Sequence, residues 1–141
     1  MMRVMLTGLQ YADIDKVKEC VCVGNAVHIV REPEFDKEEK AYKAICKGVK
    51  IGYIPCVETI RGYYKASNHD AHRSDLATWG RATKAIREWL ESRERYQMED
   101  EWVVRVAEIT YDYDYNTVGD NYNTVGKGEL QQISVNFEDV L

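Results

Sequence analysis

Apolar and polar positions alternate in short stretches through the first half of the chain. Residues 27–31 and 40–46 each alternate, and residues 50–54 follow after the turn dipeptide Lys47-Gly48. Pro55 ends the last stretch, because proline has no N–H to donate to a sheet ladder. Short strands about 8–12 residues apart are typical of β-sandwiches and β-barrels. The pattern therefore predicts a β-rich N-terminal half.

The same alternation recurs elsewhere in the chain. We expect further strands at residues 3–6, 17–23, 102–110 and 132–137. The buried face of the second of these stays open, because valines and cysteines occupy its two sides, and Gly24-Asn25 follows it as a turn. Residues 111–128 contain a short duplication, in which residues 115–119 recur as 122–126, and we interpret this segment as an extended hairpin loop.

One segment has the period of a helix. Apolar residues recur every three to four positions between residues 75 and 96, beginning with Leu76 and Trp79 and ending with Leu90. Ser74 is a suitable N-cap, whereas Gly80 weakens the helix by about 1 kcal/mol relative to alanine. We predict one long amphipathic helix at about residues 75–96.

Together these elements predict an α+β, mainly β fold: a small OB-like or modified β-barrel of about six strands with one long amphipathic helix. A chain of 141 residues is the size of one domain with one core. We therefore treat residues 1–141 as a single domain, with the barrel strands in residues 3–56 and 102–137.

Composition indicates a folded protein and gives no sign of a membrane span. Hydrophobic residues make up 45% of the chain and charged residues 30%. No apolar run approaches the roughly 18 residues of a membrane helix, and the N-terminus does not resemble a signal peptide. We expect a cytoplasmic protein whose cysteines at positions 20, 22, 46 and 56 are buried, reduced thiols, because the C-x2-C spacing of zinc sites is missing.

The charge is unevenly distributed along the chain. The net charge is −5, yet residues 61–98 carry eight positive and five negative side chains, whereas residues 99–141 carry two positive and ten negative. A general nucleic-acid coat protein is basic throughout. Binding to nucleic acid, if present, must therefore be confined to one basic patch.

The sequence offers little catalytic or metal-binding chemistry. His69 and His72 have no third ligand at a characteristic spacing, and we interpret them as a solvated helix start. The series Asp112-x-Asp114-x-Asn116 departs from a calcium loop at its sixth and twelfth positions. No P-loop, nucleophile elbow or zincin motif is present. We therefore expect a binding module without a cofactor rather than an enzyme.

Several motifs in the N-terminal half follow one another in a familiar order. Gly8-Leu9-Gln10-Tyr11 comes first, and Gly24-Asn25 then leads through an apolar strand into Arg31-Glu32-Pro33. Ala41-Tyr42-Lys43-Ala44 precedes Gly52-Tyr53-Ile54-Pro55. In order and spacing this series resembles the HIRAN domain family over about residues 4–56.

The resemblance implies a modified OB-like barrel that binds DNA, in some members at the 3′ end of a single strand. In the family an aromatic ring stacks on the terminal base, while an acidic group meets the terminal hydroxyl. Such stacking contributes about 1–3 kcal/mol per base. A carboxylate accepts from a free hydroxyl but repels a phosphate, so it distinguishes an end from a continuing strand.

Position by position, this chain matches the family pattern in part. Tyr11 stands at the aromatic position after the first glycine, but Gln10 replaces a frequent arginine and Cys56 replaces a basic residue. The family's Tyr-Asp pair falls on Lys37-Glu38 in an ungapped match, or on Phe35-Asp36 after a shift of two residues, and we prefer the second alignment.

Our leading hypothesis is a HIRAN-like module that binds single-stranded DNA or DNA 3′ ends. The candidate DNA-binding residues are Gln10, Tyr11, Arg31, Phe35, Asp36, Lys37, Lys50, Tyr53, Arg81, Lys84 and Arg87. The alternative is an acidic protein-interaction module or inhibitor that keeps the barrel and binds a basic protein partner through its acidic C-terminal third.

Overall fold

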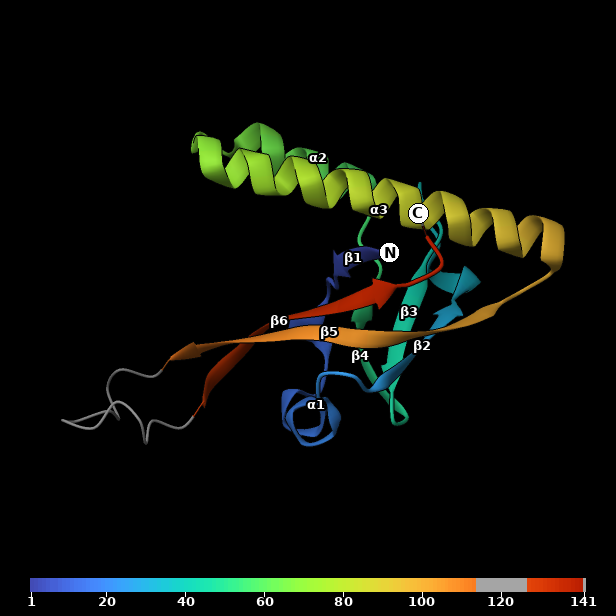
Figure 1. The fold of residues 1–141 in the computed structure, drawn as a ribbon, viewed down its shortest axis with the longest axis horizontal. Helices are drawn as coiled ribbons and strands as arrows, with labels where there is room; N and C mark the ends of the chain where they lie inside the picture. The colour runs from blue at the N-terminus through green and yellow to red at the C-terminus, as the bar shows by residue number, and fades with distance from the viewer. Residues whose placement is uncertain (114–126, 141) are drawn as a thin grey trace.

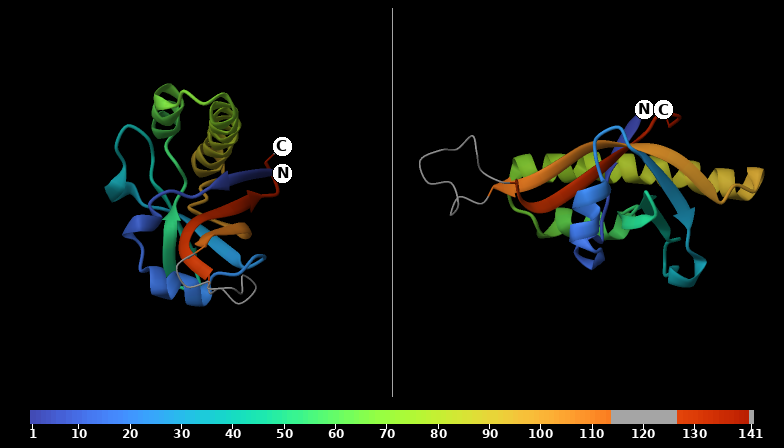
Figure 2. Two further views of the ribbon diagram at one scale, coloured as in Figure 1. Left: turned by 90° about the vertical axis from the view of Figure 1, so that its left-hand side faces the viewer. Right: turned by 90° about the horizontal axis from the view of Figure 1, so that it is seen from below.

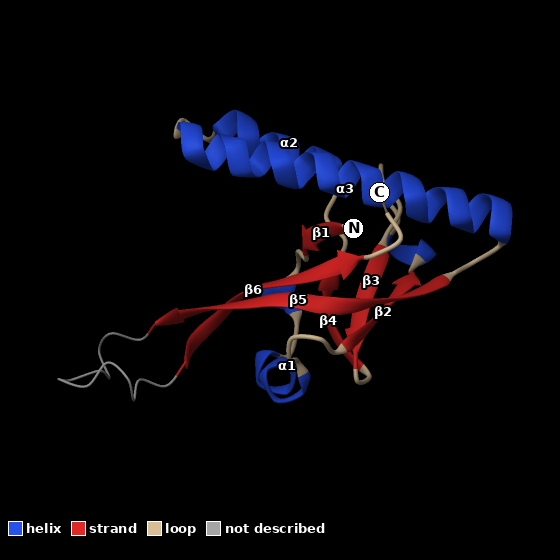
Figure 3. Ribbon diagram, viewed as in Figure 1, coloured by secondary structure: helices blue, strands red, loops and turns tan. Residues whose placement is uncertain are grey.

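The computed structural model describes residues 1–113 and 127–140. Its main feature is one antiparallel sheet with the strand order β1-β6-β5-β2-β3-β4 (Figures 1 and 3). The strands are β1 (Met2–Met5), β2 (Ala26–Arg31), β3 (Tyr42–Cys46), β4 (Val49–Tyr53), β5 (Glu101–Tyr113) and β6 (Lys127–Phe137). The sheet curls into a half-barrel, and the predicted mainly β architecture of six strands with a long helix is confirmed.

The two edges of the sheet meet just beyond β1. Thr7 and Tyr53 exchange backbone hydrogen bonds of 2.9 and 2.8 Å, so the chain after β1 is joined to edge strand β4. Gly52 makes this contact possible, because a Cβ atom there would lie 2.7 Å from the Thr7 carbonyl oxygen and its φ of 151° disfavours other residues. The close approach of Gly52 to Thr7 therefore curls the half-barrel.

The core lies between the concave face of the sheet and the long helix. Strand residues that alternate inward, such as Ile29 and Val135, are fully buried together with Ile86 and Leu90 of α3 (Asp70–Gln97). The Trp89 ring meets the Phe137 ring edge-to-face, with centroids 6.1 Å apart. Helix α3 thus covers the sheet along one side (Figure 1).

A second helix that the sequence analysis did not predict packs beside α3. Helix α2 (Val57–Ala66) buries Ile60 and is joined to α3 by a short connection, so the two form a helical hairpin. Helix α3 begins at Asp70, five residues before the predicted start, and His69 rather than Ser74 caps it by accepting from the His72 backbone N–H. The chain between β4 and the predicted helix start is therefore largely helical.

The predicted strand at residues 17–23 is wrong. The segment forms helix α1 (Ile14–Cys20), which Asp13 caps by accepting from the Lys16 backbone N–H. Val17 and Val21 are buried whereas Val23 is exposed, and this spacing of four fits one face of a helix. Because valines at positions 17, 21 and 23 also satisfy a period of two, the alternation alone did not distinguish the two structures.

The remaining expectations concern the hairpin loop, the cysteines and the membrane. Strands β5 and β6 run further than predicted, and the duplicated segment of residues 115–126 lies outside the described residues. The four cysteines are free, as expected, but only Cys46 is buried; Cys20 and Cys56 are partly exposed and Cys22 is exposed, contrary to the expected burial. Among the described residues, no helix has the length and apolar character needed to span a membrane.

Candidate nucleic-acid interface

Two glycine-containing motifs that lie far apart in the sequence come together at the junction of the sheet edges. Gly8, whose φ is 80°, begins a 3₁₀ turn, η1 (Leu9–Tyr11), and a Cβ atom there would lie 3.3 Å from the Tyr53 ring. The turn that carries Tyr11 therefore starts against the face of Tyr53. The local reason is the left-handed backbone at Gly8, which directs the chain away from β1 and over the end of β4.

Tyr53 belongs to a polar cluster on the outer face of β2, β3 and β4. Its hydroxyl donates to Glu32 Oε1 at 2.9 Å, while Lys43 Nζ pairs with Glu32 Oε2 at 3.1 Å. Glu32 is only 4% exposed, and these two contacts satisfy both of its oxygens. Lys50 Nζ donates to the Tyr53 hydroxyl at 3.2 Å and lies 5.2 Å from the ring centroid. The cluster fixes Tyr53 and keeps Lys50 over its ring.

Tyr11 stands out at the surface beside Lys50. Its side chain is 81% exposed, and it borders a depression of about 260 Å³ that Lys16 and Lys50 also line. Among the described residues, Lys50 pairs with no carboxylate. An exposed ring next to an uncompensated ammonium group is the combination that single-stranded nucleic acids use for stacking and phosphate contact.

Phe35 is the second exposed aromatic residue on this side. It ends a 3₁₀ turn, η2 (Pro33–Phe35), is 58% exposed, and donates its backbone N–H to the Glu32 carbonyl oxygen at 3.0 Å. The segments around η1 and η2 project from the same side of the half-barrel (Figure 2). We define the aromatic–basic strip as the residues that connect the two turns: Tyr11, Lys50, Tyr53, Lys43 and Phe35.

Arg31 and Asp36, both of which the sequence predicts to contact DNA, form an ion pair with each other. The Arg31 guanidinium donates two hydrogen bonds to the Asp36 carboxylate, at 2.6 and 2.5 Å, and Asp36 Oδ1 also accepts from the Ala41 backbone N–H. Arg31 Nε lies 2.7 Å from Glu94 Oε2. Hydrogen bonding to Arg31 holds the pKa of Asp36 below its usual range, and the same bond raises the pKa of Arg31.

This network changes the roles predicted for the two residues. Arg31 is mostly buried between two carboxylates, Asp36 and Glu94, so its charge is compensated within the protein. Both oxygens of Asp36 are engaged by Arg31. The network thus fastens the η2 loop to α3 and holds Phe35 outward, and neither residue presents an unpaired charge beside an aromatic ring.

Arg87 does not fit its predicted contact with phosphate. The residue is only 4% exposed, and its guanidinium donates to the carbonyl oxygens of Pro55, Lys40 and Ile54 at 2.6, 2.7 and 3.1 Å. It also lies 3.6 Å from Glu39, whose carboxylate accepts from the first backbone N–H groups of α2. Arg87 is therefore an internal bridge between α3 and the barrel.

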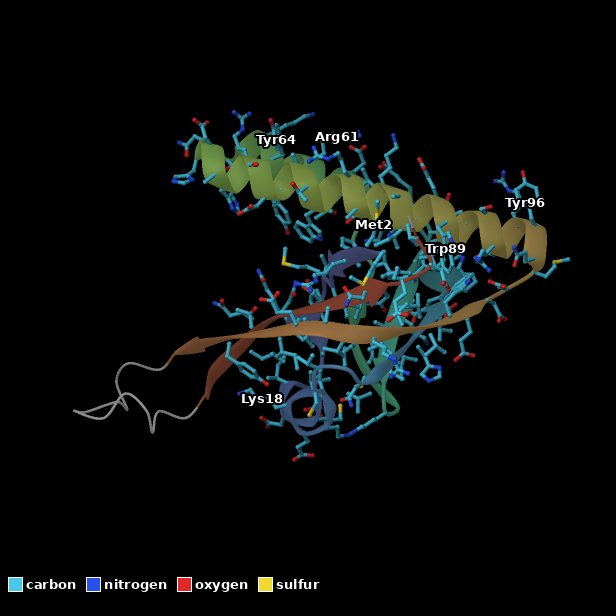
Figure 4. All side chains as sticks on the ribbon, viewed as in Figure 1. Met2, Lys18, Arg61, Tyr64, Trp89 and Tyr96 are labelled. Atoms are coloured by element: carbon cyan, nitrogen blue, oxygen red, sulfur yellow. The ribbon has the colours of Figure 1, made fainter. Side chains whose placement is uncertain are left out.

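The remaining candidate DNA-binding residues lie outside the aromatic–basic strip. Gln10 lines a cleft of about 540 Å³ between the barrel and the helices, together with Trp79. Lys37 is exposed in the loop after η2. Arg81 and Lys84 lie on α3 and border a groove between α2 and α3, which Arg61 and Tyr64 of α2, labelled in Figure 4, also line. The helix cations are not part of the aromatic–basic strip.

Sequence reasoning missed three residues of this surface. Lys43 lies in the alternating stretch of residues 40–46, and its place between the apolar Tyr42 and Ala44 is the signal that its side chain points away from the core. Lys16 was assigned to no site and borders the depression next to Tyr11. Glu32 gave no signal, because nothing in its position along the chain indicates that a carboxylate is buried between a tyrosine and a lysine.

Comparison with known proteins adds no relative: the chain matches no protein-family model, no curated protein and no solved structure.

Proposed function

We propose that this chain is a HIRAN-like module that binds single-stranded DNA along the aromatic–basic strip. The observation that carries the proposal is the exposed ring of Tyr11 beside Lys50, which pairs with no carboxylate among the described residues. The turn that ends at the exposed Phe35 projects from the same side of the half-barrel. The order of motifs in residues 4–56, which resembles the HIRAN pattern, supports the same function.

Each part of the strip suits a different part of a nucleic-acid strand. Exposed rings stack on bases without regard to sequence, at about 1–3 kcal/mol per base. Lys50 is held over Tyr53 at 5.2 Å from the ring centroid and lines the same depression as Tyr11, so its ammonium group is available to a phosphate next to a base stacked on Tyr11. Lys43 compensates Glu32 at 3.1 Å, so the carboxylate beneath the strip repels a strand less.

The geometry favours recognition of a strand over recognition of its 3′ end. End recognition in the resembling family uses a carboxylate that accepts from the terminal hydroxyl. Here the Asp36 carboxylate already accepts from Arg31 and Ala41. A 3′ preference requires a terminal hydroxyl to compete with Arg31, and we expect that preference to be weak.

Fluorescence anisotropy of a labelled oligothymidylate tests the proposal directly. A strand of about 12 nucleotides is within the span of one OB-like surface. We expect micromolar binding at low salt that weakens as salt increases, with similar affinity for strands whose 3′ end is free or blocked by phosphate. A protein that binds no strand at low salt would rule out the proposed function.

One observation favours the alternative of an acidic protein-interaction module. Several arginines of the described residues, including Arg3, Arg31 and Arg93, already pair with carboxylates, and the net charge of the chain is −5, so the protein as a whole repels a polyanion. On this alternative the protein binds a basic partner. Absence of strand binding combined with salt-sensitive binding of a polylysine peptide would support it.

A further inference from the structure

A groove runs between α2 and α3 on the helical hairpin, apart from the aromatic–basic strip. Its volume is about 290 Å³. The floor is apolar and is formed by Ile60 of α2 together with Leu76, Ala77 and Gly80 of α3. None of the strip residues lines this groove, so the two surfaces are built from different elements. We call it the helical groove.

The rim of the helical groove is positively charged. Arg61, Arg81 and Lys84 line it, and no carboxylate does so among the described residues. Arg61 pairs with Glu58 one turn away on α2. Within the described part of the chain, Arg81 and Lys84 form no ion pair, and Arg81 only donates to the Thr78 hydroxyl at 3.3 Å. The groove therefore combines an apolar floor with uncompensated cations in a protein that is acidic overall.

Gly80 keeps this part of the floor of the helical groove free of a side chain. Glycine in the interior of a helix is less stable than alanine. An added Cβ would meet Ile60 at 3.5 Å, an ordinary contact, so packing at Gly80 does not require glycine. Without a side chain at Gly80 the floor of the helical groove stays open, although alanine at this position would make the helix more stable.

We propose that the helical groove binds an acidic peptide segment of a partner protein. An apolar side chain of the segment fills the floor at Gly80, and its carboxylates pair with Arg81 and Lys84. Charge complementarity and an apolar pocket for an anchoring side chain are what such docking requires.

The same observations disfavour a nucleic-acid strand at this place. A strand needs exposed ring faces on which its bases stack. Tyr64 is the aromatic residue that lines the helical groove, and the Arg73 guanidinium lies 4.7 Å from its ring centroid. The floor itself offers methyl and methylene groups, which suit a leucine or methionine side chain better than a phosphate backbone.

Selection from a random dodecapeptide phage library on the immobilised full chain tests the proposal. We expect enriched peptides to carry one or two large apolar residues next to several aspartates or glutamates. The strongest peptide, made synthetically with a fluorescent label, should bind less tightly by about tenfold or more to Gly80→Leu and to Lys84→Glu. Enrichment of peptides without acidic residues, or no enrichment, overturns the proposal.

Gly62 of α2 provides a matched control for Gly80 of α3. Gly62 lies in α2 with nothing within 4 Å of an added Cβ, so Gly62→Ala should raise the urea midpoint and leave peptide binding unchanged. Gly80→Ala should also raise the midpoint but weaken the peptide. Equal peptide affinity of the wild type, Gly80→Ala and Gly80→Leu, with both variants folded, overturns the proposal.

The peptide experiment is independent of the proposed DNA function. Tyr11→Ala should leave peptide binding intact, whereas Lys84→Glu should leave oligothymidylate binding at the strip intact. If Lys84→Glu and Arg81→Glu instead abolish oligothymidylate binding and no acidic peptide is selected, the groove serves nucleic acid and the peptide proposal fails.

Discussion

The guanidinium of Arg87 donates from Nε to the carbonyl oxygen of Pro55 at 2.6 Å, which joins the middle of α3 to the end of β4. Two further donors of the same group reach the carbonyl oxygens of Lys40 and Ile54. The long helix is therefore fastened to the half-barrel by a buried cation that bridges two loops, in addition to its apolar face.

Removal of this bridge should destabilise the whole molecule. In Arg87→Met, three backbone carbonyl groups lose their donor at a site that is almost inaccessible to water. We expect the free energy of unfolding to fall by about 2–4 kcal/mol, measured by urea denaturation. The matched control Arg81→Met replaces an exposed arginine on the same helix and should change it by less than about 0.5 kcal/mol. Equal effects of the two variants would contradict the bridging role.

Gly52 should tolerate no side chain. A Cβ atom would lie 2.7 Å from the Thr7 carbonyl oxygen, and the backbone φ of 151° is strained for other residues. We expect Gly52→Ala to lose about 2 kcal/mol or more of stability, because the contact between the sheet edges must open. The control Gly62→Ala has no such neighbour and should be neutral or stabilising. A fully stable Gly52→Ala would mean that the edges need not meet.

The ion pair of Arg31 and Asp36 should make stability depend on pH in acid. Because Arg31 lowers the pKa of Asp36 in the folded state, the pair stabilises fully above the pKa of an unfolded aspartate, about 4. This contribution is lost as the pH falls through the lower folded value. The wild type should exceed Asp36→Asn in stability at neutral pH, and the difference should shrink toward pH 2. A constant difference in thermal midpoint across this range would contradict the assignment.

Two of the exposed tyrosines, Tyr11 and Tyr96, should differ in their effect on DNA binding. Tyr11→Ala removes a ring of the aromatic–basic strip, and we expect a loss of about 1–3 kcal/mol in oligothymidylate binding by anisotropy. Tyr96 is similarly exposed but sits near the C-terminal end of α3 (Figure 4), so Tyr96→Ala should bind like the wild type. Similar losses in both variants would show that binding is not localised to the strip.

The cysteines should react in the order of their exposure. Burial raises the pKa of the Cys46 thiol, so the reactive thiolate is scarce there, whereas Cys22 is exposed. Iodoacetamide at mildly alkaline pH should label Cys22 in the native protein and Cys46 only after unfolding, as mapped by mass spectrometry. Rapid native labelling of Cys46 would indicate that β3 opens.

Secondary structure was predicted correctly where the spacing of apolar residues fits only a strand or only a helix. It was predicted wrongly where the spacing fits both. Residues 27–31 and 102–110 are strands, as their alternation predicted, and the spacing of Leu76, Ile86 and Leu90 predicted the interior of α3. The valines of α1 satisfied a period of two as well as a spacing of four, and the burial that distinguishes these readings depends on the packing of α1 against β4.

For the candidate site, the sequence by itself determined which residue types are present: aromatic residues at positions 11 and 35, several cations, and glycines at positions 8 and 52. Only the tertiary structure decided which of these side chains are paired, buried or exposed. It paired Arg31 with Asp36 and Glu94, buried Arg87 beneath Pro55, and left Lys50 without a carboxylate partner in the part of the chain that the structure describes. The physical reason is that the free energy of a charge depends on its desolvation and its neighbours, and those neighbours come from segments up to 63 positions away, as Glu94 does from Arg31.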